Sequence, residues 1–169
     1  MEQEAYERVV MEQKDRIFSY ASMMLRNPAE AQDVAQESMI RLWQHRTGVD
    51  REGAHRWLRR TAHNLCIDRM RRRKSRPESP DDEALERGTD GSPNPQRLAE
   101  SSELAGVLER ALGTLPERDR AVIVLREVQG MPYNEIAEAL GIPLGTLKAR
   151  LHRARDLLRT KLVRAGVTP

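Results

Sequence analysis

A short helix, a glycine and a second helix loaded with arginine form the most constraining feature of this chain. Residues 135–155 read EIAEALGIPLGTLKARLHRAR. At about 100° per residue, the second helix separates an apolar stripe from an opposite, mostly polar side. The stripe is Leu147, Leu151, Ala154 and Leu158, and the opposite side carries Lys148, Ala149, His152 and Arg153. One face is therefore predicted to pack, and the other is predicted to contact an anionic partner.

The same stretch meets the requirements of a helix-turn-helix. Such a motif needs a small residue where its helices cross, a residue that tolerates positive φ in the turn, and apolar anchors on both sides. Ala137 and Gly141 supply the first two, and the anchors are Ile136, Leu140, Ile142 and Leu147. The alternative is a helical hairpin whose arginines only face solvent. Because the spacing and the basic surface occur together, we predict a DNA-binding motif.

The residues that would touch DNA follow from this geometry. The second helix of such a motif enters the major groove with its N-terminal residues against base edges, and neighbouring basic side chains contact phosphates. The candidates for base edges are Thr146, Lys148, Ala149, His152 and Arg153. The candidates for phosphates are Arg150, Arg155 and Arg159.

Composition supports a helical protein that binds nucleic acid. Charged residues make up 33% of the 169 residues, hydrophobic ones 38% and aromatic ones 4%, so each core must be small and largely aliphatic. The formal net charge is only +3, yet basic residues concentrate at 56–74 and 148–164, and acidic ones at 78–103. Basic patches of this kind are the usual electrostatic footprint of a nucleic-acid binder.

Apolar periodicity divides the chain into two helical domains. Apolar residues recur with helical spacing at 3–25, 28–45 and 55–74, which predicts three helices that form a first domain over residues 1–74. The first two helices are separated at Asn27-Pro28, where Asn27 can cap the second helix. Residues 75–97 are rich in Pro, Ser, Gly, Asp and Glu and are predicted to be a flexible linker. A second domain covers 98–169 and includes a helix that starts at Pro116 and ends at Gly130. No segment alternates apolar and polar residues in the way that a β-strand does, so the predicted fold class is all-α.

The third helix of the first domain is arginine-rich and follows a polar loop, residues 46–54. A loop beside an aromatic residue can receive an unstacked base, and a basic helix next to it can hold single-stranded backbone. The candidates are Arg56, Trp57, Arg60, His63 and Asn64. Two alternatives stay open, since the arginines can form a solvated face and Trp57 can be a core residue.

The second helix of the first domain displays a mixed face. Its apolar stripe is formed by Val34, Ala35, Met39, Leu42 and Trp43. The mixed face outside this stripe consists of Asp33, Gln36, Glu37, Ile40 and Arg41. Such a face suits either a protein partner or plain solvent.

The sequence offers no support for catalytic or metal chemistry. His63 and Cys66 lie three residues apart, but no second pair with ligand spacing follows, so a hydrogen-bonded histidine and a packed cysteine are the better interpretation. No glycine-rich phosphate loop, HExxH or GxSxG motif is present. We therefore expect no enzyme, no metal and no cofactor.

The compartment follows from cysteine usage and hydropathy. Cys66 is the single cysteine, so no intramolecular disulfide is possible. The N-terminal residues lack the pattern of a signal peptide, and no run approaches the roughly 20 apolar residues of a membrane span. We expect a cytoplasmic protein without membrane insertion.

Three blocks in order carry a resemblance to a known family. They are NPAEAQDVAQESMIRLWQHR, then RWLRRTAHNLCIDRMRRRK, and, after the polar linker, LPERDRAVIVLREVQGMPYNEIAEALGIPLGTLKARLHRARDLLR. Together they resemble a bacterial RNA polymerase sigma factor of the extracytoplasmic-function class, over nearly the whole chain. The last block is the most specific. The resemblance implies two helical domains, regions two and four, and a protein that gives core RNA polymerase its promoter choice.

The resemblance also implies a role for each candidate surface. The face of Asp33, Gln36, Glu37, Ile40 and Arg41 would dock on the large polymerase subunit. The segment from Gly48 to Asn64 would open the minus-10 element and hold a flipped base, and the helix from Pro143 to Arg155 would read the minus-35 element. Many relatives are held inactive by an anti-sigma factor, and we expect one here.

This sequence departs from the family pattern at three places. Ser38-Met39 stands where an aromatic is common, Ala149 where a serine is common, and Pro143 at a usual capping position. The Ala149 departure affects the exact minus-35 preference. Two alternatives remain. One is a helix-turn-helix regulator of the type fused to response-regulator receivers, which would need alternating strands and helices in residues 1–74, and the other is an anti-sigma or adaptor mimic of the first domain.

Overall fold

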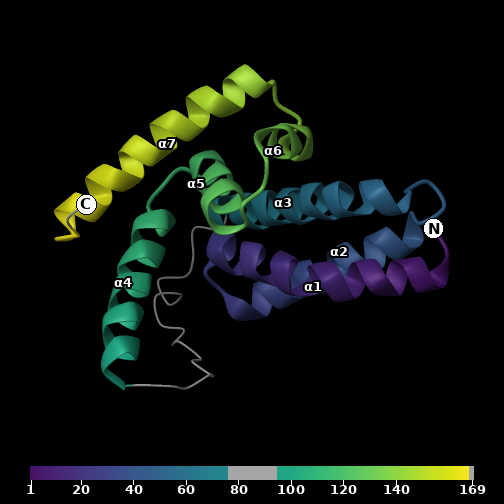
Figure 1. Ribbon diagram of the computed structural model, residues 1–169, viewed down its shortest axis with the longest axis horizontal. Helices are drawn as coiled ribbons and strands as arrows, with labels where there is room; N and C mark the ends of the chain where they lie inside the picture. The colour runs from purple at the N-terminus through teal and green to yellow at the C-terminus, as the bar shows by residue number, and fades with distance from the viewer. Residues whose placement is uncertain (76–94, 168–169) are drawn as a thin grey trace.

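The computed structural model describes residues 1–75 and 95–167, and every regular element in these ranges is helical (Figure 1). The all-α prediction is therefore confirmed. The elements are α1 (Gln3–Leu25), α2 (Pro28–Gln44), α3 (Arg51–Ser75), α4 (Pro95–Gly113), α5 (Glu117–Ile123), a π-helical turn η1 (Val124–Val128), α6 (Tyr133–Leu140) and α7 (Leu144–Arg164).

The first three helices form a bundle whose ends agree with the sequence signals. α1 stops at Arg26, which adopts φ 54°, and its N–H donates to the Ser22 carbonyl. The Asn27 side chain accepts a hydrogen bond of 3.1 Å from the backbone N–H of Glu30, with Pro28 at the first helical position. The predicted break and cap are confirmed. Large side chains buried between these helices include Ile17, Tyr20, Met24, Leu42 and Leu58.

α3 begins earlier than the periodicity predicted. The loop expected at 46–54 ends at Asp50, because its side chain accepts a hydrogen bond of 2.6 Å from the backbone N–H of Gly53 and Glu52 lies in the first turn. A side-chain oxygen that satisfies a free N–H stabilises the start of a helix. Residues 51–54 of the expected loop are therefore helical.

The second group of helices contains the predicted helix-turn-helix. Gly130 and Gly141 adopt φ of 64° and 65°, a region that favours glycine, and each follows the end of a helix. The helix predicted from Pro116 to Gly130 is α5 continued by η1. Most of the linker predicted at 75–97 lies outside the described residues, while Ser75 and residues 95–97 belong to α3 and α4.

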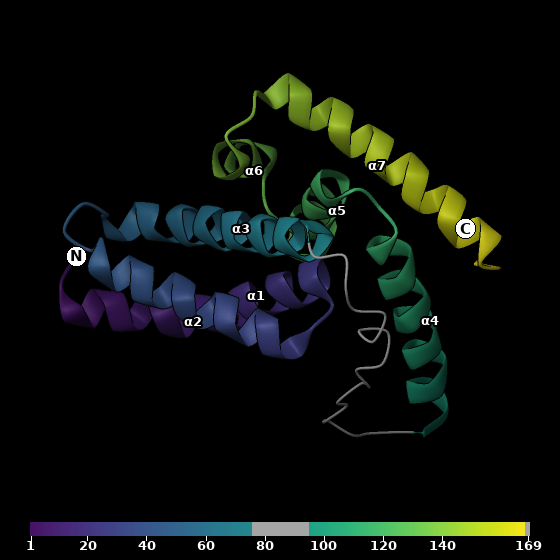
Figure 2. The same ribbon diagram turned by 180° about the vertical axis from the view of Figure 1, so that it is seen from behind.

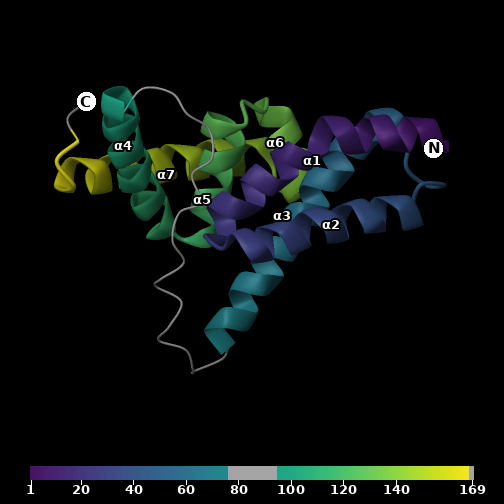
Figure 3. The same cartoon turned by 90° about the horizontal axis from the view of Figure 1, so that it is seen from below.

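The two groups share one packed core. Side chains from α5, η1, α6 and α7 belong to the same buried cluster as those of α1, α2 and α3. Helix α6 packs beside α3, and Figures 1 and 2 show α6 viewed along its axis. Helices α4 and α7 lie at the end of the molecule away from the N-terminus (Figure 3). The guanidinium of Arg120, itself buried, bridges the groups by donating hydrogen bonds to carbonyls of Met24, Leu112, Gly113 and Leu115.

Candidate nucleic-acid interface

The packing of α7 divides its residues as the periodicity predicted. Leu147, Leu151 and Ala154 are buried, and Leu158 is half-buried against the core. The candidates for base edges are all exposed, namely Thr146, Lys148, Ala149, His152 and Arg153. The start of α7 is therefore free on its outer side to contact a ligand.

Acidic residues pair with the arginines of α7. Arg153 Nη2 donates to Asp119 Oδ1 over 2.8 Å, and the Asp119 side chain is only 2% exposed whereas that of Arg153 is 64% exposed. Arg155 donates from Nε to Glu127 Oε1 over 2.8 Å, and this hydrogen bond raises the pKa of Arg155. These pairs orient the guanidinium groups while much of each arginine still faces water.

Arg150 lies deeper than a purely phosphate-binding residue would. It is half-buried, and burial together with the neighbouring Arg118 lowers its pKa. The charge of Arg150 in turn acts on His63 of α3. Arg150 is therefore less accessible to a phosphate than the exposed Arg155 and Arg159.

The candidates on α3 divide into exposed and inward-facing side chains. Arg56, Arg60 and Asn64 are exposed. Trp57 is half-buried, packs against the core and lies with its ring centroid 5.6 Å from that of His45. The alternative of Trp57 as a core residue is thus partly correct, with one side of the residue still open.

His63 is the hydrogen-bonded histidine that the sequence predicted, which makes it a poorer candidate for contact with a DNA strand. Its Nδ1 lies 2.7 Å from the hydroxyl oxygen of Tyr20, a fully buried residue that needs a hydrogen-bond partner. Burial, with smaller contributions from Arg150 and Arg118, lowers the pKa of His63 to about 4. The imidazole is therefore neutral at pH 7 and supplies no positive charge to a DNA strand.

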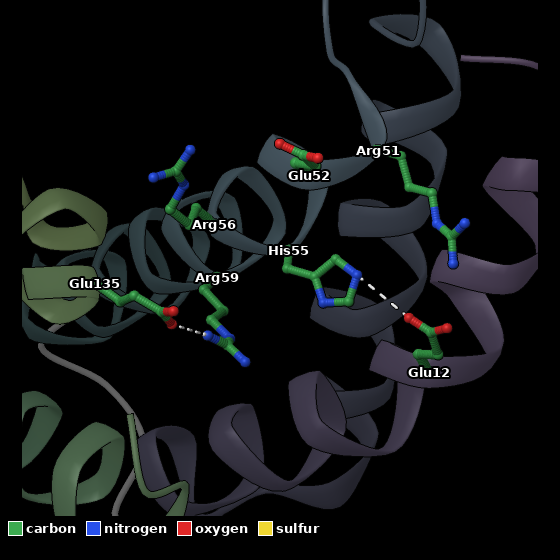
Figure 4. A pocket seen from close by; sticks show the side chains of 7 residues that line it. All are labelled: Glu12, Arg51, Glu52, His55, Arg56, Arg59 and Glu135. Atoms are coloured by element: carbon green, nitrogen blue, oxygen red, sulfur yellow. Dashed lines mark hydrogen bonds and ion pairs between the residues drawn. The ribbon is translucent and has the colours of Figure 1, made fainter. Parts of the chain in front are cut away.

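Helix α6 covers part of the basic side of α3. Arg56 Nη1 donates to Glu138 Oε2 over 2.7 Å, and Arg59 Nη1 donates to Glu135 Oε2 over 3.0 Å. Beside these pairs opens a pocket of 720 Å³ between α1, α3 and α6 (Figure 4). Its lining consists of acidic residues, arginines and one histidine, namely Glu12, Arg51, Glu52, His55, Arg56, Arg59 and Glu135.

The mixed face of α2 is accessible. Asp33, Gln36, Ile40 and Arg41 are exposed and Glu37 is half-buried, with Arg41 donating to Glu37 Oε1 over 2.6 Å. Ile40 is 56% exposed. Trp43 was expected in the apolar stripe but is 36% exposed, and its ring centroid lies 3.9 Å from the Arg46 guanidinium carbon and 4.9 Å from the Tyr6 ring centroid. An aromatic residue thus adds to this face.

Cys66 is a packed core residue. Its side chain is buried, and burial raises the pKa of the thiol to about 12, which keeps it protonated and unreactive. Among the residues that the structure describes, no group of three or more His, Cys, Asp or Glu could hold a metal ion. The described helices also include none that is long and apolar enough to cross a membrane.

Comparisons with known proteins decide what this assembly of helices is. Residues 9–76 match the family Sigma-70 region 2, and residues 105–158 match Sigma-70, region 4. The chain is 36% identical to the ECF RNA polymerase sigma factor SigW of Bacillus subtilis, an alignment that covers 95% of this chain and 90% of the relative. The chain belongs to the ECF RNA polymerase sigma factors. The members of this family direct RNA polymerase to specific promoters when transcription starts, and they are not enzymes.

One further relative supports this assignment for the sigma factor, and a solved structure shares its fold. It is 34% identical to the ECF sigma factor SigE of Mycolicibacterium smegmatis over 95% of its own length, and it spans 62% of that longer protein. Its fold is similar to the sigma factor RpoE in complex with the anti-sigma factor NepR from Bartonella quintana, with a TM-score of 0.72 and 21% identity over 93% of this chain and 96% of that one. The alternative of a receiver-type regulator is wrong, since residues 1–75 of this sigma factor are helical and match region 2.

Several residues of this interface were missed by the sequence analysis. Asp119, Glu135 and Glu138 pair with arginines that lie 34, 76 and 82 residues away. No periodicity within one helix could indicate these partners. The exposed Trp43 was missed for a different reason, since helical spacing places it on the edge of the apolar stripe and does not indicate its contacts with Arg46 and Tyr6.

Proposed function

We propose that the second helical domain of this sigma factor, residues 98–169, reads the minus-35 element with α7. The observation that carries this proposal is the outer side of α7, where basic residues are exposed while the apolar stripe is buried. Base edges are contacted by Thr146, Lys148, Ala149, His152 and Arg153. The exposed Arg155 and the half-buried Arg150 contact phosphates. Contacts to base edges supply the specificity, and contacts to phosphates fix the register.

The first domain, residues 1–74, opens the minus-10 element in this proposal. Arg56 and Arg60 hold the single-stranded backbone, while Trp57 and Asn64 receive an unstacked base. Unstacking a base requires a few kcal/mol, so its capture in a site must offset that amount. His63 acts without charge, by supporting Tyr20 and the neighbouring turn of α3.

Core RNA polymerase is proposed to bind the mixed face of α2. This face offers Asp33, Gln36, Glu37 and Arg41 as polar groups around Ile40, and the structure adds Trp43 beside them. Exposed aromatic and aliphatic side chains with a polar rim are typical of protein interfaces. Binding to polymerase would hold the minus-35 and minus-10 contacts on one complex, so that each contact would raise the apparent affinity of the other for DNA.

A regulatory partner and a location complete the proposal. The structurally similar RpoE was solved with an anti-sigma factor. We expect this chain to bind an anti-sigma factor in the cytoplasm and to start transcription after release. Full activity of the free chain in its host without any release step would contradict this part.

Run-off transcription tests the proposed function directly. Purified bacterial core polymerase would be mixed with genomic fragments, with and without the sigma factor. Specific transcripts that require the chain, with start sites that share two upstream elements, are the expected result. If polymerase gains no promoter specificity while the chain alone shifts a duplex operator, the proposed role of residues 1–74 is wrong.

Replacing Asn64 with alanine is expected to separate the two DNA steps. Asn64 is exposed on α3 and does not belong to α7, the helix proposed to read the minus-35 element, so Asn64→Ala should leave binding to duplex minus-35 DNA unchanged. It should impair promoter opening, because a base extruded from the stack loses a polar partner. Permanganate footprinting of the opened strand and a gel shift with duplex DNA measure the two steps. Equal losses in both assays would contradict the assignment.

A further inference from the structure

Helix α6 packs on part of the surface of α3 that is proposed to bind promoter DNA. We propose that, in the free chain, α6 is an intramolecular competitor of the minus-10 strand, with the carboxylates of Glu135 and Glu138 taking the place of backbone phosphates. This inference rests on the proposed function of α3. It concerns the arrangement of the chain before polymerase and promoter are bound.

The two ion pairs between these helices supply the first observation. Glu138 pairs with Arg56, whose side chain is 50% exposed, and Glu135 pairs with Arg59, whose side chain is only 8% exposed. A carboxylate and a phosphate both accept hydrogen bonds from the planar guanidinium group, so either can satisfy the same arginine. An arginine already paired with Glu138 must lose that partner before it binds a strand.

The turn of the helix-turn-helix supplies the second observation. A Cβ added at Gly141 would lie 4.0 Å from Arg60 Nη2, so the backbone of the turn lies close to this arginine. Residues 56, 59 and 60 are three and four positions apart and therefore share one side of α3. α6 and its turn thus cover adjacent basic positions, including two of the five candidates for the minus-10 element.

Besides the shared core and the buried bridge from Arg120 to the Met24 carbonyl, two further water-exposed contacts join the two groups of helices. Gln129 Nε2 donates to the Arg16 carbonyl over 2.7 Å, and Lys74 Nζ lies 2.8 Å from Glu117 Oε1. The Gln129 contact and most of the paired side chains are exposed to water, where ion pairs contribute little individually. The ion pairs add little to the closed arrangement, so a ligand that separates the groups must mainly offset the shared core and the Arg120 bridge by binding the open arrangement better.

Separation of the two groups of helices and DNA binding by α3 are thermodynamically linked. If α6 and a DNA strand exclude each other on α3, any partner that separates the two groups of helices raises the affinity of α3 for DNA. Polymerase bound to α2 and to the second domain would act in this way. Free sigma factor would bind single-stranded DNA weakly for the same reason.

The test compares the free full-length chain with a double variant, Glu135→Gln and Glu138→Gln. Binding to an oligo-dT probe would be measured by fluorescence anisotropy, and the compactness of the chain by small-angle X-ray scattering. The matched control is Glu103→Gln with Glu109→Gln, which removes the same charge from exposed positions on α4. We expect the double variant to bind the probe about threefold to tenfold more tightly than the control, since two weak ion pairs are lost.

A third variant identifies which arginine is released. Adding Arg56→Gln to the double variant should remove most of the gain, because the strand would then lose the arginine that Glu138 had covered. Affinity equal to that of the control, with unchanged scattering, would overturn the inference and leave the proposed function intact. Scattering that shows an expanded chain without tighter DNA binding would also overturn it, and would argue against DNA binding by α3 as well. Run-off transcription with the same variants distinguishes these two failures.

Discussion

Replacing Arg120 with leucine is expected to lower the free energy of unfolding by about 3 kcal/mol or more. The Arg120 guanidinium is buried and donates hydrogen bonds to four carbonyls, of which Leu112, Gly113 and Leu115 belong to the α4–α5 segment and Met24 to the end of α1. Leucine fills part of the space but donates no hydrogen bond. The Leu112 carbonyl keeps a hydrogen bond of 3.1 Å from the Leu115 N–H, but a buried carbonyl that loses its partner costs about 1–3 kcal/mol.

Urea unfolding followed by circular dichroism measures this effect. Arg110→Leu is the matched control, because Arg110 is exposed on α4 and should tolerate the change within about 0.5 kcal/mol. Arg120→Lys should fall between the two, since an ammonium group retains the charge but cannot reach several carbonyls at once. A loss below about 1 kcal/mol for Arg120→Leu would show that the bridge between α1 and the α4–α5 segment contributes little.

Local signals in the sequence predicted the helices and the inner side of α7 well. Asn27 caps α2 and Gly141 ends α6 in the positive-φ region, because these residue types satisfy local backbone needs wherever they occur. The apolar stripe of α7 is buried as its periodicity requires. Asp50 indicates the early start of α3, because aspartate is a common helix N-cap, but apolar spacing alone does not show this.

Contacts between distant segments could not be predicted in the same way. Arg120 and Met24 are 96 residues apart, and Arg56 and Glu138 are 82 apart. Such pairs depend on how helices pack, and an exposed arginine looks the same in the sequence whether or not a glutamate covers it. His63 shows the consequence, since the sequence grouped it with the candidates for the minus-10 strand but could not identify Tyr20, 43 residues away, as its hydrogen-bond partner.

Replacing Arg153 with alanine is expected to weaken binding to a duplex minus-35 element by about 1–3 kcal/mol. The Arg153 side chain is 64% exposed on the outer face of α7, and its single hydrogen bond to Asp119 leaves other N–H groups for a base edge. The carboxylate fixes the direction of a long side chain, so less freedom is lost when DNA binds. Asp119→Asn should therefore weaken specific binding too, by a smaller amount, while Arg153 is still present.

The two substitutions must be combined, because Arg153→Ala also leaves the Asp119 carboxylate, 2% exposed, without this cation. If Asp119 acts by positioning Arg153, then Asp119→Asn should have no further effect on DNA affinity once Arg153 is alanine. Fluorescence anisotropy with the element defined by mapped start sites, and with single-base changes in it, measures affinity and specificity. Arg159→Ala is the control, since loss of a phosphate contact should weaken binding to every sequence alike. Additive losses at Asp119 and Arg153 would contradict the positioning role, and a loss at Arg153 that is equal for all sequences would place this arginine on a phosphate instead of a base.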